Sequence, residues 1–179
     1  YRRAPAGGEF SYYSNYDQEH VLDVAGIHGR TWEHEAADFH ITYMIGNDQP
    51  SYQSAARIRD AGMAAGYRFR IISFIASQDQ CVVEVENVGV APIYYDAWVT
   101  VNGVRASQSL KRLCPGDTLT CTVATGGAEL DLTIECDRLV PGQVIQYESD
   151  LDGAAVTTVS GTPAPPPRNL PTSREFRPD

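Results

Sequence analysis

The apolar and polar positions divide the chain into a first part of mixed periodicity and a longer part with strand periodicity. Residues 39–46 (FHITYMIG) alternate apolar with polar side chains, which predicts a strand. Residues 51–65 follow the N-cap candidate Asp48 and also Pro50, which suits a first helical turn, so a helix is predicted that ends at Gly66. A strand that leads into a helix is typical of α/β architecture.

Two shorter helices are predicted before this strand. Residues 17–26 offer Asp17 as an N-cap and Gly26 as a stop. Residues 31–40 (TWEHEAADFH) offer Thr31 as an N-cap and place two glutamates in the first turn, where the helix dipole favours negative charge.

From Tyr67 onward the apolar period is two. Strands are predicted in YRFRIISFIA, CVVEVEN, IYYDAWVTVNG, TLTCTVA, ELDLTIEC and QVIQYESDL, with turn signals such as NGVR, CPGD and VPGQ between them. Many short strands at this spacing are typical of an antiparallel sandwich.

The four cysteines favour two disulfides and an oxidising compartment, because their count is even and the surrounding sequence is rich in strands. Cys81 and Cys121 both lie mid-strand on apolar faces. A hairpin between TLTCTVA and ELDLTIEC would bring Cys136 beside Cys114. We therefore predict pairs of Cys81 with Cys121 and of Cys114 with Cys136; the other two connectivities, and four thiols in a cytosolic protein, stay open.

Charge excludes one class of function. The net charge is −9, from 14 Lys+Arg against 23 Asp+Glu, which does not supply the basic face that nucleic acid requires. No stretch is long and apolar enough to span a bilayer. From its start at Tyr1 we expect the chain to be an excised or processed segment.

Four stretches carry a resemblance to a known family: GGE at residues 7–9, FHITYMIG, AGYRFRI and VEVENVGVAPIYYD. Over roughly residues 6–150 the chain is similar to the DUF4832-type domain, the C-terminal part of secreted, glycosidase-like (β/α)8 barrel proteins. The resemblance implies the last strands and helices of a barrel followed by a β-sandwich. A barrel of this type needs roughly 250 residues, so about six of its strands would precede Tyr1.

The predicted fold class is therefore α+β, in three segments. Residues 1–66 would be a remnant of the last βα units of a (β/α)8 barrel, and residues 67–153 an antiparallel Ig-like β-sandwich. Residues 154–179 are rich in Pro and polar side chains, which predicts a tail or linker.

Glu9 is the candidate catalytic residue. In (β/α)8 enzymes a carboxylate at the C-terminal end of a strand faces the active site, and glycoside hydrolysis normally uses two carboxylates. Glu33 or Glu35 would supply the second only if their segment were a barrel loop. The plain alternative is that Glu9 caps a helix or pairs with an arginine.

Aromatic side chains suggest sugar platforms, because Tyr and Trp combine an apolar ring with a polar tip. The candidates are Tyr12, Tyr13, Tyr16, Trp32 and Trp98. Partly buried core aromatics are the alternative interpretation for each.

No resident cofactor or metal is predicted. Asp150 and Asp152 before Gly153 form a fragment of a calcium-loop pattern, which leaves a calcium ion as the open alternative to a plain turn.

Three hypotheses of function follow. The first is a non-catalytic accessory segment of a secreted glycosidase-like protein, which supports a barrel and binds carbohydrate. The second is an extracellular structural subunit that assembles with other copies of itself. The third is a glycoside hydrolase that uses Glu9, so whether the chain is an enzyme is left open.

Overall fold

The computed structural model describes residues 1–10, 14–46, 48–149 and 156–158. The chain forms two compact units. Unit 1 comprises Tyr1–Arg68 and Gly89–Pro92, and unit 2 comprises Phe69–Val88 and the residues from Ile93 onward. The structure is mixed α+β, as predicted, and its described strands do not close into a barrel.

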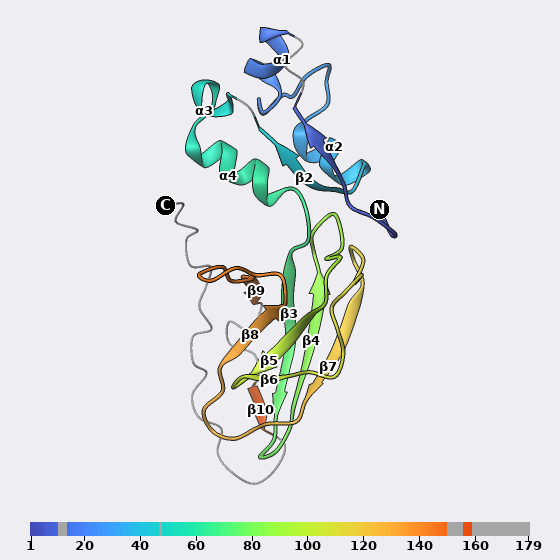
Figure 1. The fold of residues 1–179 in the computed structure, drawn as a ribbon, viewed down its shortest axis with the longest axis vertical. Helices are drawn as coiled ribbons and strands as arrows, with labels where there is room; N and C mark the ends of the chain where they lie inside the picture. The colour runs from blue at the N-terminus through green and yellow to red at the C-terminus, as the bar shows by residue number, and fades with distance from the viewer. Residues whose placement is uncertain (11–13, 47, 150–155, 159–179) are drawn as a thin grey trace. The chain divides into compact units, whose positions relative to one another are not determined.

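Unit 1 has the order β-α-α-β-α-α (Figure 1). Its elements are β1 (Ala6–Glu9), α1 (Asn15–His20), α2 (Trp32–Asp38), β2 (Ile41–Ile45), α3 (Gln49–Tyr52) and α4 (Ala55–Met63). The strands β1 and β2 run parallel and form a two-stranded sheet. A parallel pair needs a crossover connection, and the two helices between the strands supply it.

Helices α2 and α4 cover one face of this sheet. Trp32 and Ala36 of α2 and Ala61 of α4 join Leu22 in a buried cluster, on which Ile41 and Met44 of β2 pack. Ile41 and Met44 reach the same side because β2 has one extra residue, Thr42, where the register shifts between Ala6 and Gly7.

Unit 2 has two sheets. The larger contains β3 (Phe69–Ala76), β4 (Cys81–Asn87) and β7 (Thr118–Val123) in antiparallel order, with β9 (Tyr147–Ser149) and β10 (Val156–Thr158) both parallel to β3. The smaller contains β6 (Val104–Arg105), β5 (Ala97–Val101) and β8 (Leu132–Cys136), all antiparallel.

Alternate residues of both sheets are buried, as the period of two predicted. Cys81, Val83 and Val85 of β4 have no exposed surface, and neither have Ala97 and Val99 of β5. Apolar burial on this scale is the main source of folding free energy. The segment after β6 contacts both sheets, because the Ala106 amide donates to the Val99 carbonyl and the Ser107 amide donates to the Thr122 carbonyl.

The predicted helix over residues 51–65 is two helices. α3 ends at Tyr52, Gln53 is extended (ψ 151°), and α4 starts afresh with Ser54 as its N-cap. The Gln53 side chain donates to the Glu19 carbonyl and to Asp23. These hydrogen bonds stabilise the extended residue between the two helices. The predicted stop at Gly66 is also displaced, because α4 ends at Met63 with Ala64 as its C-cap, although Gly66 does adopt a left-handed φ of 75°.

The predicted hairpin between residues 118–123 and 132–136 is wrong. β7 pairs with β4 in one sheet, whereas β8 pairs with β5 in the other. The two strands therefore do not bring Cys114 beside Cys136 in the predicted way.

All four cysteines are free in the structure, so neither predicted disulfide is formed. Cys81 lies opposite Val123, and Cys121 lies opposite Val83. The two cysteines are thus diagonal neighbours, a relation that separates Cα atoms by about 7–8 Å, beyond the usual span of a disulfide.

Candidate functional site

Among the described residues of unit 1, no helix or strand covers the face of the β1–β2 sheet turned away from the buried cluster. Its residues are Gly7 and Glu9 of β1 and their register partners Tyr43 and Ile45 of β2; we call this the open face. Tyr43 is 53% exposed and Ile45 is 50% exposed. Parallel strands are usually buried on both faces, so this exposure is unusual.

The Tyr43 ring lies across Gly7. A Cβ atom added to Gly7 would stand 2.7 Å from Tyr43 ring carbons and 2.4 Å from the Tyr43 carbonyl oxygen. Gly7 therefore permits both the ring position and the close approach of the strands. The same construction at Gly8 meets nothing within 4 Å. Tyr43 was not among the predicted site residues; alternation on β2 together with a glycine-rich partner strand was the signal for it.

Glu9 is the last residue of β1, and its exposed side chain belongs to the open face. It therefore lies where the prediction placed it, at the C-terminal end of a parallel strand.

Asp48 lies three residues beyond the end of the neighbouring strand β2. It is exposed, and it is the N-cap of α3 although its side chain makes no capping hydrogen bond. Sequence reasoning assigned Asp48 a capping role only, so it missed a second carboxylate at this edge.

The two glutamates considered as partners of Glu9 lie elsewhere. Glu33 and Glu35 are on α2, whose predicted N-cap Thr31 is confirmed by its bond to the His34 amide. Glu33 accepts a hydrogen bond from Arg57 at 2.6 Å, and Glu35 is paired with Arg30. Both carboxylates stabilise unit 1 rather than joining Glu9.

A polar network joins α1 to α3. Nε2 of Gln49 and Nε2 of Gln53 donate to the carbonyls of Gln18 and Glu19, two carbonyls of the C-terminal turn of α1. His20 Nδ1 lies 2.6 Å from the Asp23 carboxylate. The hydrogen bonds from His20 and Gln53 hold the pKa of Asp23 below its usual value. This network ties α1 to α3.

The N-terminal aromatic candidates do not form a platform in the described residues. Trp32 is only 5% exposed and its Nε1 donates to the Ala61 carbonyl at 2.7 Å, so it belongs to the core and is unavailable to a sugar. Tyr16 is exposed and its ring lies 4.5 Å from that of His20. Tyr12 and Tyr13 lie outside the described residues, as do Asp150 and Asp152 of the calcium-loop fragment.

Unit 2 carries two arginine–aromatic pairs on and beside the smaller sheet. The Arg105 guanidinium lies 4.3 Å above the centroid of Trp98, and its N–H groups also pair with Glu135 and Asp137. The predicted platform residue Trp98 is thus covered on one face by a fixed guanidinium. The Arg138 guanidinium lies 5.3 Å from the centroid of Tyr95, which is 55% exposed.

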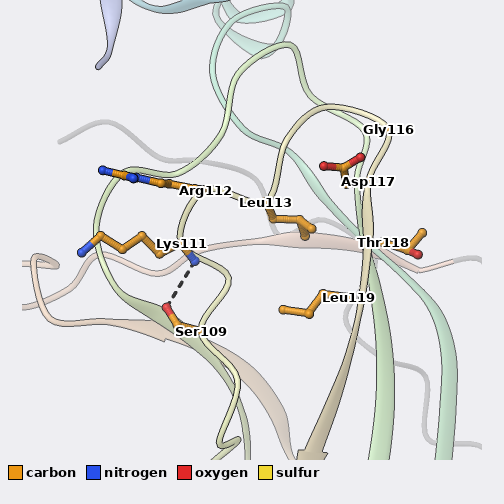
Figure 2. A pocket seen from close by; sticks show the side chains of 8 residues that line it. All are labelled: Ser109, Lys111, Arg112, Leu113, Gly116, Asp117, Thr118 and Leu119. Atoms are coloured by element: carbon orange, nitrogen blue, oxygen red, sulfur yellow. Dashed lines mark hydrogen bonds between the residues drawn. The ribbon is translucent and has the colours of Figure 1, made fainter. Parts of the chain in front are cut away.

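An open depression of about 560 Å3 lies beside the loop before β7 (Figure 2). Ser109, Lys111, Arg112 and Asp117 line part of it. Figure 2 shows the Lys111 and Arg112 side chains extending in the same direction, away from Asp117. Arg112 has a left-handed φ of 63°, which is uncommon for a residue other than glycine, and its amide donates to the Ile93 carbonyl at 2.8 Å.

No group of three or more His, Cys, Asp or Glu side chains among the described residues is placed to hold a metal ion. Across the same residues, no helix is both long and apolar enough to cross a membrane. Comparison of the chain with family models, curated proteins and solved structures gave no match.

Proposed function

We propose that this chain is the C-terminal part of a larger, secreted, glycosidase-like protein. In this proposal unit 1 supplies the last two βα units of a (β/α)8 barrel of the DUF4832 type. Unit 2 forms an Ig-like β-sandwich that serves as an accessory module.

The open face is the observation that carries the proposal. A two-stranded sheet is marginally stable alone, and parallel strands are found with both faces covered. Unit 1 has the alternation of parallel strands and helices that a barrel requires, with helices on one face only. In a closed barrel the open face would point inward, where Tyr43 and Ile45 would join layers of packed side chains.

The intact mass of the natural gene product tests this proposal. A complete barrel requires about 180 residues beyond unit 1, so we expect roughly 20 kDa in addition to the 19.6 kDa of this chain. A natural product of 19.6 kDa that sediments as a monomer would exclude the barrel. A product of that mass that sediments as an oligomer, in proportion to its concentration, would instead support the self-assembling structural subunit.

A glycoside hydrolase is the second candidate, favoured by the position of two carboxylates. Glu9 ends β1 and Asp48 follows the end of the neighbouring strand β2. In this mechanism one carboxyl group protonates the leaving oxygen, while the other acts as the nucleophile or activates water.

Substitution on the natural gene product tests the hydrolase. Turnover on a panel of glycans should fall at least 100-fold in both Glu9→Gln and Asp48→Asn. Glu35→Gln, which removes a carboxylate of α2 already paired with Arg30, is the matched control and should keep full turnover. Unchanged turnover in Glu9→Gln removes Glu9 from the chemistry and leaves the accessory role.

A further inference from the structure

Two hydrogen bonds show which main-chain groups of β7 point away from its sheet. β7 is the edge strand beside β4. The Asn87 amide of β4 donates to the Asp117 carbonyl at 3.1 Å, whereas the Thr122 amide donates away from β4, to Oε1 of Gln108, at 3.0 Å. The bonding direction alternates from residue to residue along an antiparallel strand. The odd-numbered residues of β7 therefore bond to β4, and the even-numbered residues point their amides and carbonyls outward.

The segment that follows β6 covers the outer side of β7 at Thr122. The Ser107 amide donates to the Thr122 carbonyl at 3.3 Å. The segment then leaves β7 and follows β5 in the other sheet, where the Leu110 amide donates to the Ala97 carbonyl at 2.7 Å. The first half of β7 is therefore left without a neighbour from this segment.

Thr118 and Thr120 carry the outward main-chain groups of that first half. Both residues are exposed, and their amides and carbonyls have no hydrogen-bond partner among the described residues. Folded proteins usually protect an edge strand with a lysine, a proline or a bulge. β7 has the sequence TLTCTV and pairs with β4 in regular register, so none of these protections is present within the strand. Such an edge can pair with the main chain of another extended segment.

Space for an added segment lies beside the open half of β7. The depression of Figure 2 is lined by residues of the 109–113 loop and by residues 116–119. Figure 2 shows the Leu113 and Leu119 side chains between the loop and the strand. Leu113 is buried and Leu119 is half-buried. They give the depression an apolar floor on which an aliphatic side chain can be buried.

The length and charge of this edge favour a peptide over a second copy of the chain. The open stretch runs only from Thr118 to Thr120, whereas a stable interface between folded proteins buries about 1,200–2,000 Å2. Each copy would also bring a net charge of −9 to the contact. A single extended segment without acidic residues meets neither obstacle.

We propose that the open half of β7 binds an extended peptide segment of another protein, which adds an antiparallel strand to the larger sheet. The amides and carbonyls of Thr118 and Thr120 would bond to its main chain. The peptide residue opposite Leu119 would place an aliphatic side chain on the floor formed by Leu113 and Leu119. This proposal goes beyond the function given above, and it does not depend on the barrel because β7 belongs to unit 2.

A synthetic peptide of alternating threonine and valine, with a lysine at each end, tests the site. Its binding to the full 179-residue chain would be measured by fluorescence anisotropy. With the valines on the apolar floor, the threonine amides face β7 and the valine amides face away. N-methylation of the threonines should therefore lower the affinity at least tenfold, whereas N-methylation of the valines should change it less than about threefold.

Substitutions at Thr120 test the same site from the protein side. Thr120→Pro removes the outward amide without removing a bond to β4, and it should lower the affinity at least tenfold. Thr120→Ala keeps this amide, so it is the matched control and should stay within about twofold of the parent. Amide exchange measured by NMR should be fast at Thr118 and Thr120 in the free chain and slowed by the peptide, while the Leu119 amide is protected in both states.

Several results would overturn the site. They are no binding at about 1 mM peptide, an equal or reversed effect of the two methylations, and an equal loss in Thr120→Ala. A free chain that sediments as a dimer, and that Thr120→Pro makes monomeric, would show a second copy at this edge in place of the peptide. Circular dichroism verifies that each variant is folded, and the methylated peptides decide alone if Thr120→Pro is not. A failure of the barrel would leave all these results unchanged.

Discussion

The β3–β4 pair of unit 2 and the β1–β2 pair of unit 1 both carry apolar side chains, but the two pairs differ in how far these side chains are buried. Along β4 every second residue is fully buried, from Cys81 to Asn87. Along β2 the apolar residues divide, with Ile41 and Met44 packed on the core of unit 1 and Tyr43 and Ile45 half exposed. Unit 2 therefore closes its own interior, whereas unit 1 buries one face of its sheet and leaves the other open.

The largest expected effect comes from the closed interior of unit 2. Phe69 has no exposed surface, so Phe69→Ala should lower the free energy of unfolding of unit 2 by about 3–5 kcal/mol, through lost burial and a residual cavity. Tyr43→Ala should cost less than about 1 kcal/mol, since half of that side chain is already in solvent. Urea unfolding of the two variants measures the contrast, and equal losses would show that the open face is covered.

Thiol reactivity examines the same interior. Burial raises the pKa of Cys121 to about 11, and it also raises the pKa of Cys81. In the native chain at pH 8, Cys121 should react with iodoacetamide roughly 100-fold more slowly than an unburied thiol, and the half-buried Cys114 and Cys136 should react first. Urea should make all four thiols available. Two thiols or fewer in unfolded, unreduced protein would show disulfides that this structure lacks.

Alanine substitutions at two neighbouring glycines of β1 test the strand pairing in unit 1. Gly7→Ala should cost about 2 kcal/mol, because the added methyl group meets the Tyr43 carbonyl and ring. Gly8→Ala is the control and should be neutral within about 0.5 kcal/mol, because its methyl group meets nothing. Hydrogen exchange of the β2 amides should quicken only in Gly7→Ala; equal exchange in both variants would contradict the register of β1 on β2.

The smallest expected effect concerns pH and unit 1. The hydrogen bonds from His20 and Gln53 depress the pKa of Asp23 in the folded chain, so this group stabilises folding above the pKa of an unfolded aspartate, about 3.9. The contribution is lost as pH falls through the lower folded value. Because the pair is exposed, we expect less than about 1 kcal/mol. Asp23→Asn should flatten the acid limb of unit 1 stability, and an unaltered limb would contradict the depressed pKa.

Local signals in the sequence predicted much of this fold. Thr31 caps α2 as predicted, because capping depends on a few adjacent residues. Alternation predicted the buried face of β4 for a similar reason. The β5–β6 turn at Asn102 and Gly103 has positive φ at both residues, as an Asn-Gly hairpin requires.

Long-range relations were not accessible in the same way. Adjacent strands in sequence suggested a β7–β8 hairpin, but each strand pairs in a different sheet, and the cysteine pairing inferred from that hairpin failed with it. Trp32 is a residue type that often stacks on sugars, and only its burial and its hydrogen bond to the Ala61 carbonyl show that it belongs to the core. At the open face, Glu9 was predicted from resemblance, whereas Tyr43 required the register and the extra residue of β2.

Photochemical cross-linking from position 43 tests most directly whether further barrel strands of the same polypeptide cover the open face. Tyr43 would be replaced by p-benzoylphenylalanine in the natural gene product, and the adduct mapped by mass spectrometry. We predict an intramolecular adduct to a strand residue of the same polypeptide outside these 179 residues. An adduct to β2 of a second copy, or the absence of any protein adduct, would contradict the barrel.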